Sequence, residues 1–537
     1  EAHDIKIDPV SHPYFVEVDK PDMHDPSGDR ERLLAAIARD WQLDGLDISL
    51  PVLAGLQQTL RDSDWKVTVA IRNGREVIAV WPGFRDRLYG VAIDVGSTTI
   101  AAHLCELASG EVLASAGCMN PQIRFGEDLM SRVSYIMMNP GGDEELTSAV
   151  REALNELVCD VAESADVIPA DIVELTVVGN PIMHHLVLGL NPVELGQAPF
   201  ALTTDRAVNV TAHELGIDIN RGGYVYALPC IAGHVGADTA GVLLAEAPFA
   251  RDEVSLIVDV GTNAEILLGN RERILAASSP TGPAFEGAQI SGGQRAAPGA
   301  IERVRIDPET LEPRYRVIGC ERWSDEPEFA DELPKSGVTG ICGSGIIEAI
   351  AELYLVGVIN QDGVITADNV ARSERVQPDG RTFSYTLVDG EPGVVIRQND
   401  VRAIQLAKAA LYAGARLLME KLGVDSVDRI RLAGAFGAHI DVTYAMVLGM
   451  IPDCALDQVS SAGNAAGTGA RIALLDRASR DLVDKQTRQV RKIETAVEER
   501  FQHHFVGAMA IPHADDPFPK LQSAVTLPAR KASATPG

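Results

Sequence analysis

The chain has few cysteines, and their arrangement excludes whole classes of site. Seven cysteines are scattered through 537 residues, and no two of them form a C-x₂-C pair. This spacing does not fit the ligand set of a zinc site or an iron–sulfur cluster. An odd, dispersed set of thiols in a chain of this length is typical of a reducing compartment, so we expect a cytoplasmic protein.

Basic residues are also scarce. The 47 Lys and Arg residues face 76 Asp and Glu residues, which gives a formal net charge of −29. Nucleic acids and anionic membranes require basic surfaces, so we expect neither as a partner. No apolar run approaches the roughly 18 residues of a membrane-spanning helix. Nucleotides are not excluded, because backbone N–H groups and a divalent cation can bind phosphates in an acidic protein.

Two common nucleotide-binding signatures are missing, namely G-x-x-x-x-G-K-[ST] and G-x-G-x-x-G. The first absence excludes a P-loop, and the second excludes the dinucleotide fingerprint. The chain has instead two similar segments, at residues 89–100 and 254–265. Each is a β-branched apolar run followed by Asp-Val-Gly, small polar residues and a second apolar run. This pattern predicts a strand, a tight turn and a second strand.

We interpret the two turns as phosphate-binding devices. Asp94 and Asp259 end the first strand of each pair, where a carboxylate can hold a hydrated Mg²⁺ or orient an attacking water. The residues expected to contact phosphate through backbone N–H groups or side chains are Gly96, Ser97, Thr98, Thr99, Gly261, Thr262 and Asn263. One such hairpin alone would be interpreted as an acidic β-turn, so the interpretation depends on its repetition.

The sequence around the turns repeats as well. Each copy has three strands, a helix, a strand that ends in a Gly-containing turn, a helix, a strand and a helix. The first long helix is predicted over residues 144–164 and its counterpart over 401–422, by apolar spacing. A repeat of this size means that a whole α/β domain is duplicated. The sequence therefore predicts two ribonuclease H-like halves that face each other across a nucleotide cleft.

Composition divides the chain into consecutive segments: a linker over 1–26, a small α/β middle domain over 27–87, a first ribonuclease H-like half over 88–248, a second half over 249–505 with an insertion near 300–400, and a tail over 506–537. Prolines and charges mark the linker as extended and irregular. The Pro- and Ala-rich tail is expected to fray. No chemistry is visible in the middle domain, whose expected role is docking or spacing.

Three further stretches are candidates for the site. Gly343 and Ser344 follow a glycine-rich turn and begin a helix, which fits either an anion contact or an N-cap that allows close packing. The turn Gly434-Ala435-Phe436-Gly437 is expected beside the adenosine, because only a backbone with little side-chain bulk fits there. Glu286 lies in a Gly- and Pro-rich stretch, and we treat it as a third catalytic candidate in the cleft or at a target surface.

Other polar residues are interpreted mainly as structural. His184 and His185 are neighbours at a helix start and point about 100° apart, which disfavours a shared metal ion. Cys230 and Cys342 are expected to be small packing residues, and His234 a capping residue. The remaining candidates, for positioning a water, are Asp238 and Glu265.

Taken together, these motifs resemble those of the superfamily that contains acetate and sugar kinases, heat-shock chaperone ATPases and actin. More narrowly, the chain resembles the reductive activators of corrinoid-dependent enzymes. The matching stretches are residues 94–99, 178–185, 259–265, 279–287, 340–348, 432–437 and 463–470. In the superfamily the two hairpins are the phosphate motifs and the Gly-x-x-Gly turn is the adenosine motif, within an actin-like fold.

The resemblance implies an ATPase that returns an inactive Co(II) corrinoid protein to Co(I) by coupling ATP binding and hydrolysis to uphill electron transfer. It implies ATP and Mg²⁺ as cofactors, a corrinoid partner of the methyltransferase or methionine synthase type, and a homodimer. Family members carry a ferredoxin-like [2Fe–2S] domain before the linker, and its four cysteines are absent from this sequence. Because the chain begins at Glu1 rather than Met, we expect a shortened form, although a separate electron donor would also fit.

Two other functions are compatible with the same cleft. The first is a kinase for a small molecule, either a sugar or a carboxylic acid. The second is a nucleotide-gated module that clasps another protein, which the lack of a peptide-binding β-domain after the second half disfavours. ATP consumption that depends on a small acceptor, or protein binding that ignores cobalamin, would separate them from corrinoid activation.

Overall fold

The computed structural model describes residues 4–529, which form two compact units. The first unit extends to Ala247 and also includes Ala465–Gln489. The second unit comprises Pro248–Asn464 and residues 490–529. The stretch Ala465–Gln489, which the sequence places within the second half, therefore groups with the first unit.

The N-terminal part of the first unit is a four-stranded sheet in the order β1-β3-β4-β2. Its strands are β1 (Ser11–Glu17), β2 (Asp47–Ile48), β3 (Lys66–Arg72) and β4 (Glu76–Pro82), and its helices are α1 (Asp29–Trp41) and α2 (Leu50–Asp62). The expectation of an irregular linker over 1–26 was wrong for β1, which pairs antiparallel with β3 along its length. Pro13 suggested a break, yet β1 is an edge strand, where proline is tolerated.

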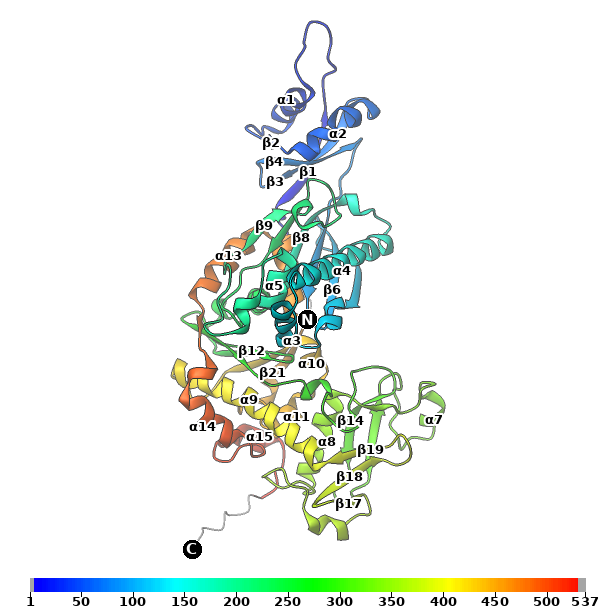
Figure 1. The fold of residues 1–537 in the computed structure, drawn as a ribbon, viewed down its shortest axis with the longest axis vertical. Helices are drawn as coiled ribbons and strands as arrows, with labels where there is room; N and C mark the ends of the chain where they lie inside the picture. The colour runs from blue at the N-terminus through cyan, green and yellow to red at the C-terminus, as the bar shows by residue number, and fades with distance from the viewer. Residues whose placement is uncertain (1–3, 530–537) are drawn as a thin grey trace. The chain divides into compact units, whose positions relative to one another are not determined.

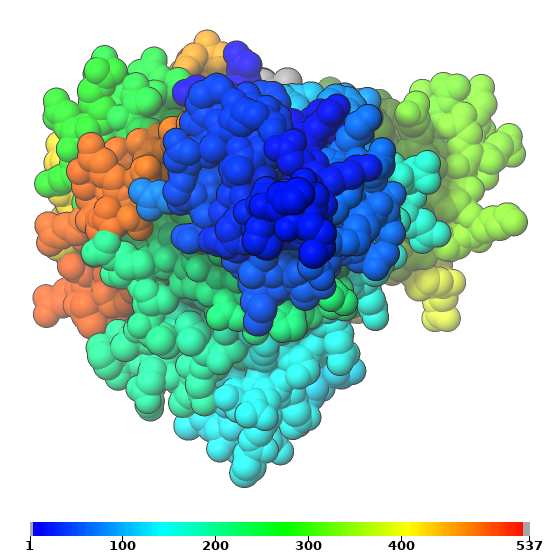
Figure 2. All heavy atoms as spheres, turned by 90° about the horizontal axis from the view of Figure 1, so that it is seen from above, coloured from blue at the N-terminus to red at the C-terminus, as the bar shows by residue number. Residues whose placement is uncertain are grey.

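A buried ion cluster fixes this small sheet to the rest of the first unit. Glu174 is fully buried, and its carboxylate accepts two 3.0 Å hydrogen bonds from Arg72 of β3 and one of 3.1 Å from Arg480. Arg480 lies on α13 (Arg477–Gln489). Figure 2 shows the N-terminal residues in blue as one continuous body, with the orange atoms of α13 beside it. A carboxylate without these partners would be costly to bury, so the three charges hold the elements together.

The main sheet of the first unit has six strands in the order β7-β6-β5-β8-β10-β9. Its strands are β5 (Tyr89–Val95), β6 (Thr99–Glu106), β7 (Val112–Met119), β8 (Ile172–Gly179), β9 (Val208–Thr211) and β10 (Tyr224–Ala227). β5, β6 and β7 form an antiparallel meander, whereas β5, β8 and β10 are parallel. This is the ribonuclease H-like order that the sequence predicts.

Helices cover both faces of this sheet (Figure 1). They are α3 (Leu129–Met138), α4 (Gly142–Ser164), α5 (Pro181–Leu188), α6 (Ala237–Glu246) and α12 (Ala465–Leu475). Val91 and Ile93 of β5 share one buried cluster with α4 and α5. On the other face α12 packs against β5 and β8, where the Thr176 hydroxyl donates a 2.7 Å hydrogen bond to the Ala470 carbonyl. This contact explains why α12 groups with the first unit.

The second unit contains the same sheet again, in the order β21-β20-β11-β12-β13-β22. Its strands are β11 (Ser255–Val260), β12 (Ala264–Gly269), β13 (Ile274–Ser279), β20 (Arg429–Ala433), β21 (Val459–Gly463) and β22 (Arg491–Lys492). Again the first three are antiparallel and the next two join in parallel beside β11. The prediction of a duplicated α/β fold is confirmed.

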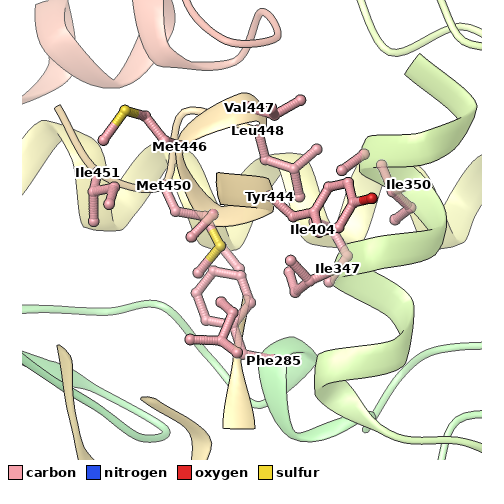
Figure 3. Close-up of a cluster of buried hydrophobic side chains, with 14 of the residues drawn as sticks. Phe285, Ile347, Ile350, Ile404, Tyr444, Met446, Val447, Leu448, Met450 and Ile451 are labelled. Atoms are coloured by element: carbon pink, nitrogen blue, oxygen red, sulfur yellow. The ribbon is translucent and has the colours of Figure 1, made fainter. Parts of the chain in front are cut away.

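An insertion of two small sheets interrupts the second copy, as expected. The strands are β14 (Ala300–Ile306), β15 (Pro313–Val317), β16 (Gly340–Ile341), β17 (Val376–Asp379), β18 (Thr382–Val388) and β19 (Val394–Arg397). The helices of the unit are α7 (Phe329–Glu332), α8 (Gly343–Leu355), α9 (Gln398–Leu422), α10 (Gly434–His439), α11 (Val442–Val447), α14 (Glu499–Ala508) and α15 (Pro519–Ala524). Buried Phe285, Ile347 of α8, Ile404 of α9 and Tyr444 of α11 converge in one cluster (Figure 3).

The expectation of a fraying tail over 506–537 was wrong for the part that the structure describes. Phe518 and Leu521 are buried, and the side-chain nitrogen of buried Lys408 donates hydrogen bonds to the carbonyls of Ala510 and, at 2.9 Å, Pro512. A lysine on α9 thus fixes this segment through backbone groups, which composition cannot reveal. Residues 530–537 lie outside the described residues.

Candidate functional site

The first predicted turn lies between β5 and β6, where half-buried Asp94 precedes Gly96-Ser97-Thr98 and Thr99 begins β6. A Cβ on Gly96 would lie 2.3 Å from the Thr99 carbonyl oxygen. This close approach admits only glycine unless the backbone shifts. The turn is therefore as tight as the sequence predicts.

Two buried side chains hold the carbonyl groups of this turn. Asn120 donates from Nδ2 to the Gly96 carbonyl at 2.9 Å, and its backbone N–H donates to the Thr98 carbonyl at 2.8 Å. Arg132 of α3 donates from Nη2 to the Ser97 carbonyl at 2.6 Å. All three carbonyls of the turn are thus bonded to the segment that follows β7.

The held carbonyls determine where the amides point. In a trans peptide the C=O and the next N–H lie on opposite sides. The N–H groups of Ser97, Thr98 and Thr99 therefore point away from Asn120 and Arg132. Successive N–H groups with a common direction form the concave cradle that binds anions in other proteins. The first turn is therefore suited to phosphate oxygens.

Two more polar residues lie beyond the carboxyl ends of the strands parallel to β5. Asn180, after β8, accepts a 3.0 Å hydrogen bond from the Met183 N–H and caps α5. Asp238 is at the start of α6, where its carboxylate accepts a 2.9 Å hydrogen bond from the Thr239 N–H. Burial of this carboxyl raises the pKa of Asp238 to about 6. An acid with that pKa can exchange a proton near neutral pH, which keeps Asp238 a candidate for water positioning.

The second turn, Gly261-Thr262-Asn263 between β11 and β12, is held in a different way. The hydroxyl of buried Thr281 donates to the Gly261 carbonyl at 3.2 Å and the Thr262 carbonyl at 3.1 Å. A single neutral hydroxyl therefore does in the second copy what an amide and a guanidinium do in the first. The amides of Thr262 and Asn263 accordingly point away from Thr281.

Asp259 lies directly beside the predicted adenosine turn. It pairs with Ala433 across β11 and β20, and a Cβ on Gly434 would lie 2.6 Å from its Oδ1. Gly434 also has a φ of +87°, which side chains rarely adopt. Both constraints require glycine, so the sheet brings the second phosphate turn and the Gly434–Gly437 turn to one edge of the second unit.

The start of α8 joins this group. A Cβ on Gly343 would lie 1.7 Å from the Phe285 carbonyl and 3.0 Å from the Phe436 ring. The rings of Phe285 and Phe436 stack, with their centroids 5.5 Å apart. Ser344 is buried, and its hydroxyl lies 3.3 Å from the Cys342 sulfur. The structure therefore places the three glycine-rich stretches of the second unit around a pair of stacked aromatic rings.

Glu286 follows Phe285 and approaches the second turn, where its Oε2 accepts a 3.4 Å hydrogen bond from the Thr262 hydroxyl. The residue keeps more than a third of its surface exposed, yet surrounding atoms displace water from the carboxyl and raise its pKa. Thr262 and the charge of Arg295 act in the opposite direction. A carboxylate in this position can act on a ligand of the turn.

The histidine pair is internal. Nδ1 of His184 lies 3.0 Å from Nδ1 of His185, and Nε2 of His185 accepts a 2.9 Å hydrogen bond from the Thr203 N–H. Burial lowers the pKa of His184 to about 3, so it stays neutral. Within residues 4–529, no group of three or more His, Cys, Asp or Glu side chains is arranged to hold a metal ion.

The sequence did not identify Asn120, Arg132 or Thr281 as part of the site. Asn120-Pro121 is a helix-start signal and Thr281 lies in the family-like stretch 279–287, but neither pattern shows that a side chain reaches a turn carbonyl. The chemistry of the two edges nevertheless fits a magnesium nucleotide. Each offers an Asp and a cradle of amides, and the second adds the partly exposed ring of Phe436 beside Gly434, which is suited to a nucleoside. No helix among the described residues combines the length and apolar character needed to cross a bilayer.

Comparison with known proteins gives three family matches that together cover most of the chain. Residues 1–87 match the RACo linker region, residues 89–247 match the RACo middle region, and residues 253–522 match the C-terminal domain of RACo, the ASKHA domain. The match to the middle region thus contains all six strands of the first unit's main sheet, and the ASKHA domain match begins just before β11.

Individual relatives match over most of the chain as well. The corrinoid activation enzyme RamQ of Eubacterium limosum is 36% identical over 427 residues, which cover 77% of this chain and 69% of that protein. The Co(II) methylated amine-specific corrinoid protein reductase of Methanosarcina barkeri is 25% identical over 414 residues, which cover 73% of this chain and 71% of that protein. A solved structure of a reductive activator for a corrinoid, iron–sulfur protein has a TM-score of 0.82 at 33% identity, over 96% of this chain and 81% of that one.

Proposed function

Because the chain belongs to the RACo family, we propose that it is an ATP-dependent reductive activator, which returns an inactive Co(II) corrinoid protein to Co(I). The observation that carries this proposal is the family match over both sheets. Each sheet contains an Asp-Val-Gly turn whose carbonyls are hydrogen-bonded on one side, so that the amides face the other side. The relatives' names supply the substrate class.

The residues proposed for nucleotide binding come from both copies of the repeat. Asp94 and Asp259 would hold Mg²⁺, directly or through water, and the two turns would bind phosphate oxygens through their amides. Magnesium supplies charge neutralisation on the phosphates. Phe436 and the glycines Gly343 and Gly434 would contact the adenosine. Asp94 or Asp259 could also orient the attacking water. Glu286, Asp238 and Glu265 are further candidates, and the carboxyls of Glu286 and Asp238 have raised pKa values.

The reduction itself is a one-electron step. Cobalt(II) gains one electron and becomes cobalt(I), and a low-potential one-electron donor is oxidised. In the family that this chain resembles, the donor is a [2Fe–2S] domain joined to the linker. ATP promotes the step only if its binding or hydrolysis changes the relative stability of two states of the activator–corrinoid complex. We propose that nucleotide binding reshapes the surface that contacts the corrinoid protein.

We further propose a cytoplasmic homodimer with Mg²⁺ as its metal cofactor. The partner is a corrinoid protein of the methyltransferase or methionine synthase type. The net charge of −29 supports a protein partner over a nucleic acid or an anionic membrane.

The decisive experiment follows the optical spectrum of a Co(II) corrinoid protein mixed with this chain and a low-potential chemical reductant, with and without MgATP. We expect Co(I) to accumulate only when MgATP is present, and phosphate release to rise when the corrinoid protein is added. The chemical reductant replaces the iron–sulfur domain, so the result does not depend on it.

Two results would contradict the proposal. Co(I) formation at an equal rate without nucleotide would mean that ATP plays no part in the reduction. ATP consumption that requires a sugar or a carboxylic acid, and does not change when the corrinoid protein is added, would instead identify a small-molecule kinase.

A further inference from the structure

Arg132 is an unusual residue to find behind a loop of small residues. It is the largest side chain in the described residues with essentially no exposed surface. Its guanidinium donates to the Ser97 carbonyl at 2.6 Å, the Gly126 carbonyl at 2.9 Å and the Gln122 Oε1 at 3.3 Å, and it lies 3.7 Å from the Met183 sulfur. None of these four partners is a carboxylate.

Burying a charged group without a carboxylate bonded to it is costly, and the nearby charge of Asp128 offsets only part of that cost. Burial lowers the pKa of Arg132 to about 10, which still leaves the guanidinium protonated at neutral pH. The fold therefore keeps a positive charge directly behind the first turn. A neutral donor would hold the Ser97 carbonyl at lower cost, as Thr281 does for the second turn. Packing alone gives no reason for the charge.

The neighbourhood is built to keep the guanidinium in place. Gln122 is fully buried, receives a hydrogen bond from Arg132 and donates one of 2.9 Å to the Leu146 carbonyl on α4. Asn120 is equally buried and donates to the Gly96 carbonyl. Both residues belong to the segment between β7 and α3. The hydrogen bonds to the turn thus belong to a network of buried side chains that also orients Arg132.

We propose that Arg132 is a positioning residue for the nucleotide phosphates. It holds the Ser97 carbonyl back so that the turn amides face the phosphates, and its buried positive charge favours their negative charge. This inference rests on the proposed function of the turn as a phosphate site. Beyond that function, it assigns a role to one residue and predicts that the two turns differ. The Ser97 carbonyl of the first turn is bonded to a guanidinium, whereas the carbonyls of the second turn are bonded to the Thr281 hydroxyl.

The test measures nucleotide binding by calorimetry for the intact chain and three variants. Arg132→Met removes the charge and the hydrogen bonds, and Arg132→Lys keeps the charge but loses the planar fork. Arg151→Met is the matched control, because Arg151 of α4 also has a pKa lowered by burial and donates a 2.9 Å hydrogen bond to a carbonyl, that of Val187. Each is titrated with MgATP, MgADP and adenosine.

We expect Arg132→Met to weaken MgATP binding by about tenfold to a hundredfold, the factor that accompanies loss of a hydrogen bond to a charged group. Adenosine binding should be unchanged, because adenosine carries no phosphate. Arg132→Lys should recover part of the affinity for MgATP. Arg151→Met should lower the unfolding temperature and leave the ratio of ATP affinity to adenosine affinity as it is.

If Arg132→Met weakens MgATP and adenosine binding equally, the residue only supports the fold. If MgATP binding is unchanged, Arg132 does not position the phosphates. Either result would overturn the inference. Should Arg132→Met fail to fold, Arg132→Lys decides, since selective weakening of MgATP supports the inference and an equal change for both ligands overturns it. These outcomes are separate from corrinoid reduction. A chain that binds MgATP through Arg132 but leaves Co(II) unreduced would defeat the proposed function alone.

Discussion

The two six-stranded sheets have the same strand order and the same Asp-Val-Gly turn, but they hold that turn by different means. In the first unit the buried Asn120 amide and the buried Arg132 guanidinium hold two carbonyls, and the Asn120 backbone N–H holds the third. In the second unit one hydroxyl, from the stretch that follows β13, holds two. The duplicated fold thus preserves the direction of the amides and not the side chains that fix it.

The surroundings of the two turns differ in the same sense. The first turn has the positive charge of Arg132 behind it. The second has a neutral hydroxyl behind it and the stacked rings of Phe285 and Phe436 nearby. We infer that the first copy specialises in phosphate charge and the second in the nucleoside. Variants of the two copies should therefore differ in which ligand they affect.

The largest difference is expected between Gly96→Ala and Gly261→Ala. A Cβ at Gly96 meets the Thr99 carbonyl at 2.3 Å, whereas one at Gly261 meets nothing closer than 3.4 Å. Gly96→Ala should move the first turn and lower the rate of phosphate release by about a hundredfold, since a displacement near 1 Å has that effect. Gly261→Ala should change the rate of phosphate release by no more than about threefold. Equal effects on phosphate release would show that the two turns do not differ in this respect.

Gly343→Ala tests the nucleoside side of the second unit. The added methyl would overlap the Phe285 carbonyl and destabilise this packing by about 2 kcal/mol. Calorimetry should find adenosine and MgATP weakened by the same factor, about tenfold, because the change does not reach the phosphates. Gly55→Ala, in α2 with nothing within 4 Å, is the control. Selective loss of MgATP would contradict the division of roles.

Acid should affect the first unit through His184. Its pKa is about 3 in the folded chain and 6.5 ordinarily, so as the pH falls below 6.5 the unfolded chain takes up a proton that the folded chain does not. The first unit should therefore lose about 2 kcal/mol of stability between pH 7 and pH 5. Hydrogen exchange of the α5 amides would measure the loss, and His184→Gln should remove the part due to His184, while neighbouring His185, whose pKa burial also lowers, keeps its own part. An unchanged slope in that variant would assign the acid sensitivity elsewhere.

The smallest effect is expected for Thr281→Val, which keeps the shape of the side chain and removes the hydroxyl. Loss of one neutral donor to two carbonyls should weaken MgATP binding by about fivefold, less than the loss of Arg132, because no charge is removed. Thr281→Ser keeps the donor and should bind as the original chain does. A loss as large as that of Arg132→Met would mean that the hydroxyl is as important as the charge.

Much of the fold could be predicted from the sequence because it depends on local patterns. The apolar runs and Asp-Val-Gly turns predicted the hairpins, and their repetition predicted the two sheets. The glycine-rich stretches at Gly343 and Gly434 were correctly grouped with the second turn's unit, because glycine is required where backbone meets backbone. These signals lie within a few residues of the feature that they specify.

The rest could not be predicted, because it depends on contacts between distant residues. Arg132 reaches a turn 35 positions earlier, and Arg480 reaches Glu174 across 306 positions. The proline in β1 suggested an irregular segment, although β1 pairs with β3. The composition of the segment after residue 506 suggested a fraying tail, although Lys408 holds that segment through two backbone carbonyls. In each case the partner is a backbone group or a buried charge, and no sequence pattern marks it.

The central claim is that ATP promotes corrinoid reduction and that each of the two Asp-Val-Gly turns is needed for this effect. The most direct measurement is the ATP-dependent rate of Co(I) formation with the original chain, Asp94→Ala and Asp259→Ala, each shown by its unfolding temperature to be folded. The account predicts that either substitution abolishes the effect of ATP. Full ATP dependence in either variant would contradict it.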